Sequence, residues 1–245
     1  WEPALRHLNT LEETVVPEPP TLFDYYDGRS AASANHKMGI ADDMGPHRLM
    51  FRYSSKFTPE QFKVFDGHFR PRNEALEKRN LRGRDRTRWN YQRYIKNYLR
   101  CVKAVDDNVG RMLKFLDDSG LAKDTVVIYS SDQGFWLGEH GWFDKRWMYE
   151  ESLKTPLLVK WPRVIDSGSI NNNIVSNLDF AQTFLDLAGV RSPSDMQGAS
   201  LVPIFKGKTP PNWRDSFYYH YYELPGGHSV ARHYGVTNGK HKLIH

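Results

Sequence analysis

Cysteine is nearly absent from this sequence, which has one, Cys101, among 245 residues. A single thiol cannot form a disulfide within the chain, and zinc sites built from several cysteines are excluded. We interpret Cys101 as a small structural thiol, because nothing near it in sequence would lower its pKa.

Long apolar runs and targeting signals are also missing. No apolar stretch approaches the ~20 residues of a transmembrane helix, so no membrane span is expected. No signal-peptide pattern is present. The chain begins at Trp1 rather than Met, and residues 241–245 look like a strand cut short. We therefore expect a part of a longer chain, in which missing targeting signals carry no information.

The composition favours a folded domain with a modest basic excess. Hydrophobic residues make up 39% and aromatic residues 13%, enough for a sizeable core in one large domain or one domain with a small appendage. The formal net charge is +5. Such an excess fits an anionic partner, whether nucleic acid, phosphate or sulfated sugar, but ordinary surface charge explains it equally well.

The first half of the sequence predicts an irregular segment followed by two helices. Residues 1–57 read as extended and irregular. Thr58 and Pro59 form a good helix start, and a short helix through Phe69 should follow. Residues 71–88 are dense in Arg and Asn, which indicates either a phosphate-binding patch or, more commonly, a solvated helix face.

The longest helix is predicted from Arg86 to Ser119. Apolar residues recur there at steps of three and four, from Ile95 to Leu116, and Gly120 is the expected C-terminal cap. Two short apolar runs, residues 125–130 and 156–161, are typical of strands covered on both faces. A helix followed by such strands predicts an α/β layered domain with a largely parallel sheet.

The last third predicts a second helix and a small sheet. Asp179 is the expected N-cap of a helix over residues 179–188 that ends at Gly189. Aromatic strands are predicted at 217–222, 234–237 and 242–244, with a turn at Asn238-Gly239. We therefore divide the chain into an α/β domain over residues 1–209 and a small, truncated antiparallel subdomain over residues 210–245.

Chemically capable side chains cluster between the two apolar strands. Asp132 and Gln133 directly follow the first strand. A carboxylate and an amide oxygen are hard ligands that suit Ca²⁺ or Mg²⁺ better than zinc, and Gly134 would let the backbone turn close to an ion. For an isolated Ser-Asp-Gln-Gly, a solvated turn is the commoner outcome.

Two basic residues follow in the same segment. His140 lies between glycines, which should free it from packing, so it can contact an anion or donate a proton. Lys145 can place a point charge on a sulfuryl or phosphoryl oxygen. A surface position explains either residue as well.

Further substrate contacts are predicted in the C-terminal subdomain. His228, Arg232 and His233 lie around the turn after Gly226-Gly227. Arg232 can pair with a uronate or a second sulfate, although a surface loop position is the commoner outcome for any one of these residues.

The ordered combination of these segments resembles type I, formylglycine-dependent sulfatases of the alkaline-phosphatase superfamily. The strand, Asp-Gln-Gly, Leu-Gly-Glu-His-Gly, Asp-Lys, Tyr-Glu and Thr-Pro-Leu-Leu-Val follow one another as in that family's second metal-binding segment. In the family, the counterparts of Asp132 and Gln133 bind metal. A sulfate-contacting lysine precedes Tyr-Glu by four residues, as Lys145 does here. His140 has a looser counterpart near the sugar or sulfate.

The resemblance implies part of an alkaline-phosphatase-like α/β/α sandwich and a sulfuric ester hydrolase that degrades sulfated oligo- or polysaccharides. It implies catalytic roles for Lys145 and His140, with Ca²⁺, or alternatively Mg²⁺, as cofactor. The family's Cys/Ser-x-Pro-x-Arg nucleophile segment, the source of formylglycine, is absent, as is its first metal-binding aspartate pair. We expect a missing N-terminal half to supply both, and a periplasmic, secreted or lysosomal location.

Three alternatives stay open. A phosphatase or phosphonate hydrolase of the same superfamily would differ mainly at the missing nucleophile. A non-catalytic module would bind an anionic glycan through the Arg-rich segment. A degenerate sulfatase homologue would be retained for binding. Nucleic acid is not the expected partner.

Overall fold

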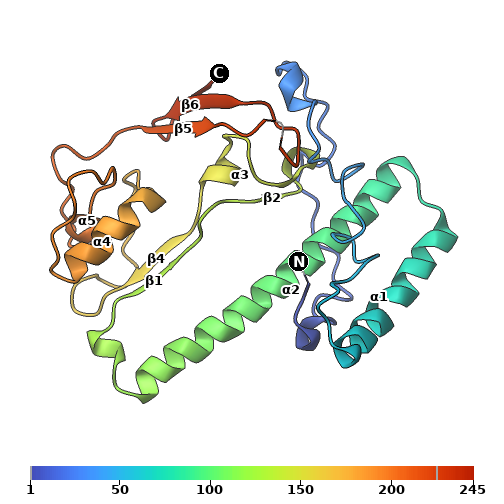
Figure 1. Cartoon of the computed structure of the whole chain (residues 1–245), viewed down its shortest axis with the longest axis horizontal. Coiled ribbons are helices and arrows are strands. Elements are labelled where there is room, and N and C mark those ends of the chain that lie inside the picture. Colours follow the sequence, from blue (N-terminus) through green and yellow to red (C-terminus); the bar gives the residue numbers. More distant parts are fainter. Residues whose placement is uncertain (1, 225) are drawn as a thin grey trace. The chain divides into compact units, whose positions relative to one another are not determined.

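The computed structural model describes residues 2–224 and 226–245, and these fall into two compact units. Unit 1 comprises Trp1–Phe115, Phe135–Lys145 and Leu224–Ala231. Unit 2 comprises Leu116–Gly134, Arg146–Glu223 and Arg232–His245. Figure 1 shows the order of the elements along the chain.

Unit 1 begins with the irregular segment that the sequence predicts. Its described residues up to position 57 hold two 3-10 turns, η1 (Leu5–His7) and η2 (Ala31–Ser33), joined by turns and loops. A single bridge pairs Gly39 with Trp142.

Helix α1 (Pro59–Arg79) starts as predicted but is longer. Gln61 N donates to Thr58 Oγ1 at 3.2 Å, and Thr58 N donates to Gln61 Oε1 at 2.9 Å, which closes a capping box. The predicted end near Phe69 is wrong. Leu76 is buried like Phe69, so the packed face continues past Pro71.

Helix α2 (Gly83–Asp118) is the long helix that the periodicity predicts. Its buried residues lie between Thr87 and Arg100. Beyond them the apolar stripe is at most partly buried, with Met112 70% exposed. Gly120 follows with a left-handed φ of 72°, as expected of a cap. Burial raises the pKa of the Cys101 thiol, in keeping with a structural role.

The core of unit 1 consists of two apolar clusters. The larger one contains Leu22, Ile40, Met44, Leu49, Tyr91, Tyr94, Ile95 and Phe143. The smaller one contains Leu8, Met50, Phe65 and Phe69. Segments far apart in sequence therefore share one core, which holds the region around Phe143 against α2. In the part of the chain that the structure describes, no helix combines the length and apolarity needed to cross a bilayer.

In unit 2, the two predicted apolar strands pair with each other, in the opposite sense to the prediction. After η3 (Ala122–Asp124), β1 (Val127–Ser130) pairs antiparallel with β4 (Leu157–Lys160). The expectation of a largely parallel sheet is wrong for this chain. Among the described residues between these strands, the only α-helix is α3 (Glu150–Leu153), a single turn. A parallel return requires a crossover along the sheet, which one turn does not provide.

The burial of these strands also differs from the expectation. Tyr129 is 41% and Leu158 65% exposed, so neither strand is covered on both faces by this chain. The two strands therefore carry more apolar side-chain surface than the described residues cover.

The helical part of unit 2 is capped differently from the prediction. Helix α4 (Phe180–Leu187) follows η5 (Asn177–Asp179) directly, and α5 (Val202–Phe205) lies further along. The cap residue of η5 is Ser176, whose backbone N–H donates to Asp179 Oδ2 at 2.8 Å. Asp179 is the N-cap of α4 by position, as predicted, but its side chain makes no capping hydrogen bond to α4; its carboxylate instead closes the capping box of η5 from the third position.

The C-terminal strands form the predicted antiparallel sheet. Strands β5 (Phe217–Tyr221), β6 (His233–Thr237) and β7 (Lys242–Ile244) pair in that order. Gly235 is required in β6, because a Cβ there would lie 2.3 Å from Leu243 O. The boundary predicted at residue 209 stays a prediction.

Candidate active-site residues

In unit 2, Asp132 and Gln133 leave the end of β1 in a short polar turn. Ser131 Oγ donates to Gln133 O at 2.8 Å, and Asn177 Nδ2 donates to Asp132 O at 3.3 Å. These bonds hold the backbone of the turn. The Asp132 side chain is exposed, so its carboxylate is accessible to a ligand.

The donor types fit a hard cation but do not complete its shell. Asp132 contributes a carboxylate, and Gln133 contributes an amide oxygen. Ca²⁺ takes about 6–8 oxygen ligands. Among the described residues, no group of three or more His, Cys, Asp or Glu side chains is arranged to hold a metal ion. The described part of this chain therefore offers part of a cation site at most.

Gly134 fixes the path of this turn through a close backbone contact. Its N–H donates to Ser152 O at 2.8 Å. A Cβ at this position would lie 2.1 Å from Glu151 O, which is far inside van der Waals contact. The glycine therefore allows the turn to pack against the backbone of α3.

Gly134→Ala should destabilise the protein by about 3 kcal/mol, because backbone atoms of α3 must move to admit the methyl group. Urea unfolding of the full-length protein measures this. Gly110→Ala is the matched control, since its added Cβ meets nothing within 4 Å and lies inside α2. We expect that variant to keep or slightly raise stability. Equal midpoints for the two variants would contradict the proposed clash.

In unit 1, His140 lies at the tip of a small hairpin. Strands β2 (Trp136–Leu137) and β3 (Phe143–Asp144) pair antiparallel, and η4 (Glu139–Gly141) connects them. A Cβ at Gly138 would lie 2.7 Å from the Tyr91 ring, and one at Gly141 would lie 2.9 Å from Leu22 O. The expectation that these glycines free the histidine from packing is wrong. They allow its loop to pack tightly.

The imidazole of His140 is held by the Asp24 carboxylate. Its Nδ1 lies 2.5 Å from Asp24 Oδ2, and Arg29 Nη2 lies 2.8 Å from the same oxygen. Burial raises the pKa of Asp24, but the Tyr26 N–H, His140 and Arg29 outweigh it, so the pKa is lowered. Asp24 is therefore an ionised partner for the histidine, and any substrate contact by His140 has to use Nε2.

Lys145 directly follows a buried, strained aspartate. Asp144 has a left-handed φ of 73° and is 9% exposed. Its Oδ2 lies 2.7 Å from His228 Nε2 and 3.6 Å from Arg48 Nη2. His228 Nδ1 lies 2.7 Å from Lys37 O. His228 thus engages both ring nitrogens inside unit 1 and anchors the residue before Lys145, which is itself half-buried.

The remaining candidates lie at the start of β6. Arg232 is exposed and directly precedes the strand. His233 is 4% exposed, and its ring packs 4.8 Å from Trp147 and 5.2 Å from Tyr221. Arg232 is thus accessible, whereas His233 belongs to the interior of unit 2. The substrate-binding roles of both residues stay predictions.

Sequence reasoning identified the loop residues but missed their partners. Asp24 and Arg48 lie about a hundred residues before the side chains that they contact. Neither belongs to a local motif, so no pattern in the sequence identifies them. Asp144 was visible only as the residue before Lys145.

Comparison with known proteins gives two family matches. Residues 21–190 match the family model described as "Sulfatase". Residues 138–245 match the model described as "N-sulphoglucosamine sulphohydrolase, C-terminal". A curated N-acetylglucosamine-6-O-sulfatase from Bacteroides thetaiotaomicron is 44% identical over 264 aligned residues, covering 100% of this chain and 47% of the relative.

Solved structures agree with these matches. One, in complex with its substrate D-glucosamine-2-N,6-O-disulfate, is 42% identical with a TM-score of 0.91, covering 100% of this chain and 53% of the other. A phosphonate monoester hydrolase from Silicibacter pomeroyi has a TM-score of 0.59 at 24% identity, covering 69% of this chain and 35% of the other, and shows the fold alone. The predicted alkaline-phosphatase-like α/β fold class is confirmed. The chain spans about half the length of the Bacteroides sulfatase and of the protein with the bound disulfate.

Proposed function

This chain belongs to the sulfatase family, and we propose that it forms part of an enzyme that hydrolyses the 6-O-sulfate ester of a glucosamine unit in a sulfated saccharide. The observation that carries this proposal is the 44% identity along the entire chain with an N-acetylglucosamine-6-O-sulfatase. The similar structure with a bound glucosamine disulfate supports the same substrate class.

The chain's own residues supply cation binding and charge stabilisation. Asp132 and Gln133 would hold a divalent cation, Ca²⁺ or Mg²⁺, together with ligands from outside this chain. Such a cation, when bound, neutralises charge on the sulfate oxygens. Lys145 adds a positive charge where negative charge develops in the transition state.

His140 is the proposed contact near the leaving group. Asp24 fixes its ring through Nδ1, as a carboxylate commonly does behind a reacting histidine. His140 would then present Nε2 to the sugar or sulfate, as an anion contact or a proton donor. Arg232 would contact a further sulfate or a uronate. His228, whose two ring nitrogens are engaged by Asp144 and Lys37, would act indirectly by anchoring the residue before Lys145.

This sequence contains no Cys/Ser-x-Pro-x-Arg segment. We propose that the nucleophile is a formylglycine and that the other half of the enzyme supplies it. We propose a periplasmic, secreted or lysosomal location, where sulfated glycans are degraded.

Sulfate release by the full-length protein tests the proposed function. The panel contains N-acetylglucosamine 6-sulfate, glucosamine 2-N,6-O-disulfate, the 6-sulfate of N-acetylgalactosamine and a phosphonate monoester. We expect sulfate from the glucosamine 6-sulfates in preference to the galactosamine epimer. Cleavage of the phosphonate ester without any sulfate release would favour the alternative that the phosphonate hydrolase fold suggests.

Lys145→Ala should lower kcat about 100-fold with little change in KM, because the charge acts mainly in the transition state. Steady-state kinetics on N-acetylglucosamine 6-sulfate measure both constants. Lys154→Ala is the control, since Lys154 is an exposed lysine nearby in sequence and should leave both constants unchanged. A rise in KM alone for Lys145→Ala would assign Lys145 to ground-state binding instead.

A further inference from the structure

A positively charged pocket lies in unit 1, among residues that the proposed function does not use. Its volume is about 310 Å³, at the lower end of the range for small-molecule sites. Its lining side chains include Glu12, Arg72, Arg79, Trp89, Arg93 and Lys96. They come from the N-terminal segment, the second half of α1 and the first half of α2, so the pocket contains none of the candidate active-site residues.

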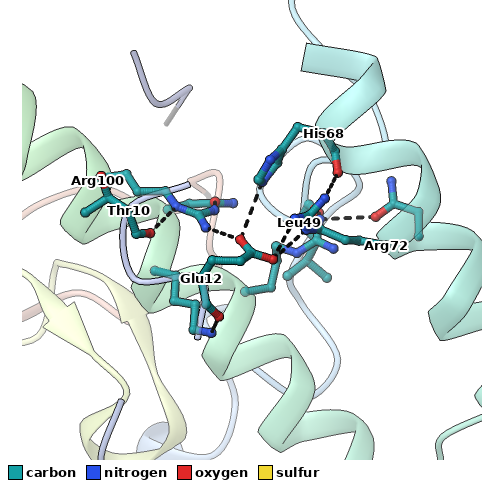
Figure 2. A network of polar contacts seen from close by, with 10 residues as sticks. Thr10, Glu12, Leu49, His68, Arg72 and Arg100 are labelled. Atoms are coloured by element: carbon teal, nitrogen blue, oxygen red, sulfur yellow. Dashed lines mark hydrogen bonds and ion pairs between the residues drawn. The ribbon is translucent and has the colours of Figure 1, made fainter. Parts of the chain in front are cut away.

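One carboxylate cannot neutralise the cations of this pocket. Glu12 accepts from Arg72 Nε at 2.7 Å and from Arg100 Nη2 at 2.8 Å, as Figure 2 shows. Arg93 Nη1 instead donates to two neutral acceptors, Leu49 O and Asn73 Oδ1, each at 3.1 Å.

Lys96 and Arg79 extend this excess of positive charge. Lys96 Nζ donates to the backbone oxygen of Glu12 at 3.0 Å, so it does not use the carboxylate either. Arg79 lies at the exposed end of α1. The described residues that line the pocket therefore carry more positive charge than their one carboxylate, Glu12, can balance.

The titration behaviour of three groups agrees with a positive local field. Burial, together with the charges of Arg72 and Arg100, lowers the pKa of His68 to about 4. Burial and the same neighbouring arginines lower the pKa of Arg93 to about 10. Burial also lowers the pKa of Lys96; the Glu12 carboxylate opposes this shift, whereas Arg100 and Arg72 add to it. A bound anion would relieve this repulsion.

Trp89 gives the pocket an apolar wall beside these charges. The indole is half-buried. The Phe51 ring stacks on it with the ring centres 5.9 Å apart, and the Arg93 guanidinium lies 4.7 Å from the indole centre, so these contacts fix its orientation. An aromatic ring next to cations suits an acidic sugar, which has an apolar C–H face and an anionic substituent. The C–H face of a pyranose packs on the ring, while a sulfate or carboxylate pairs with Arg or Lys.

We propose that this pocket is a secondary binding site for an acidic sugar unit, bearing a sulfate or carboxylate group, of a longer glycan chain. Arg79 and Lys96 contact the anionic group at the mouth of the pocket, Arg93 lies behind it, and Trp89 packs on the sugar. The anion specificity follows from the charges of the pocket alone. The assignment of the ligand as a saccharide rests on the proposed function.

Calorimetric titration of the full-length protein tests the site with a sulfated hexasaccharide of the heparin type at physiological salt. Arg79→Ala should weaken its binding about tenfold, since a charge-assisted contact of this kind contributes about 1.4 kcal/mol. Lys78→Ala is the matched control, because Lys78 is the exposed neighbour of Arg79 on α1 and does not line the pocket. It should change the Kd less than twofold.

Three further arms identify the ligand. The desulfated hexasaccharide should bind much more weakly than the sulfated one. Trp89→Leu should weaken binding of the hexasaccharide. Inorganic sulfate that binds as tightly as the hexasaccharide, with no effect of Trp89→Leu on either ligand, would replace the saccharide with a small oxyanion. Equal losses for Arg79→Ala and Lys78→Ala, or no loss for Arg79→Ala, would overturn the site.

Turnover separates this inference from the proposed function. Neither Arg79→Ala nor Lys78→Ala should change kcat/KM on N-acetylglucosamine 6-sulfate, because a single sugar does not reach a secondary site. An enzyme that releases sulfate from the monosaccharide but shows no Arg79 effect would retain the proposed function and refute the pocket. Binding of the hexasaccharide at Arg79 without any sulfate release would refute the proposed function and retain the anion site.

Discussion

Asp132→Ala in the full-length enzyme should lower kcat/KM on N-acetylglucosamine 6-sulfate by at least about 1000-fold. The carboxylate is the only anionic ligand that the described turn after β1 offers to a cation. It is exposed, while hydrogen bonds to the backbone oxygens of Asp132 and Gln133 hold the turn. In the proposed function this carboxylate would hold the cation that neutralises charge on the sulfate oxygens, so its loss would weaken stabilisation of the transition state by several kcal/mol. Asp132→Asn, which keeps the shape but not the charge, should lose nearly as much.

Metal content gives a readout that is independent of turnover. Elemental analysis of the dialysed proteins should show divalent cation in the unaltered enzyme and much less in Asp132→Ala. Gln133→Ala should retain more, since a neutral amide contributes less to binding than a carboxylate. Asp166→Ala, which removes an exposed carboxylate elsewhere in unit 2, serves as the control and should bind metal normally. Full activity after exhaustive chelation would remove the metal role from Asp132.

The sequence predicted the elements of this fold better than their pairing. Periodicity located α2, and β-branched or aromatic runs located β1, β4 and the C-terminal sheet, because these signals are local. The direction of β4 relative to β1 depends on the path of the connection between them. That path includes the β2–β3 hairpin and the one-turn helix α3. Elements this short leave no periodic pattern in the sequence, so they could not be predicted from it.

The candidate site divides in the same way. The order of Asp132, Gln133, His140 and Lys145 along the chain was enough to suggest a family. The environment of His140 was not predictable, since Asp24 reaches it across more than a hundred residues. Glycines beside a histidine also look the same in sequence whether they loosen a loop or allow it to pack, and at Gly138 and Gly141 they allow packing.

Asp179 lies at the predicted N-cap position of α4, but its side chain does not cap that helix. Its carboxylate is fully buried and accepts from four donors rather than capping one helix. Oδ2 accepts from Ser176 N at 2.8 Å and from Arg214 Nη1, and Oδ1 accepts from Ala199 N at 2.9 Å and from Arg214 Nη2 at 2.6 Å. The hydrogen bonds from Arg214 raise the pKa of that guanidinium. This carboxylate therefore joins η5, the segment before α5 and the segment before β5.

We expect Asp179→Ala to destabilise the full-length protein by about 3–5 kcal/mol, because truncation leaves a partly buried arginine and two backbone N–H groups without their acceptor. The urea midpoint of the transition that reports on this region should fall accordingly, while Asp195→Ala, at an exposed carboxylate, should shift it by less than about 0.5 kcal/mol. Asp179→Ala combined with Arg214→Met should recover part of the loss, since the second change removes the unpaired charge but not the unmet N–H groups. Arg214→Met alone gives the reference change in the free energy of unfolding. If adding Arg214→Met to Asp179→Ala lowers stability by that same amount, the two side chains are not coupled and the ion pair does not hold these segments together.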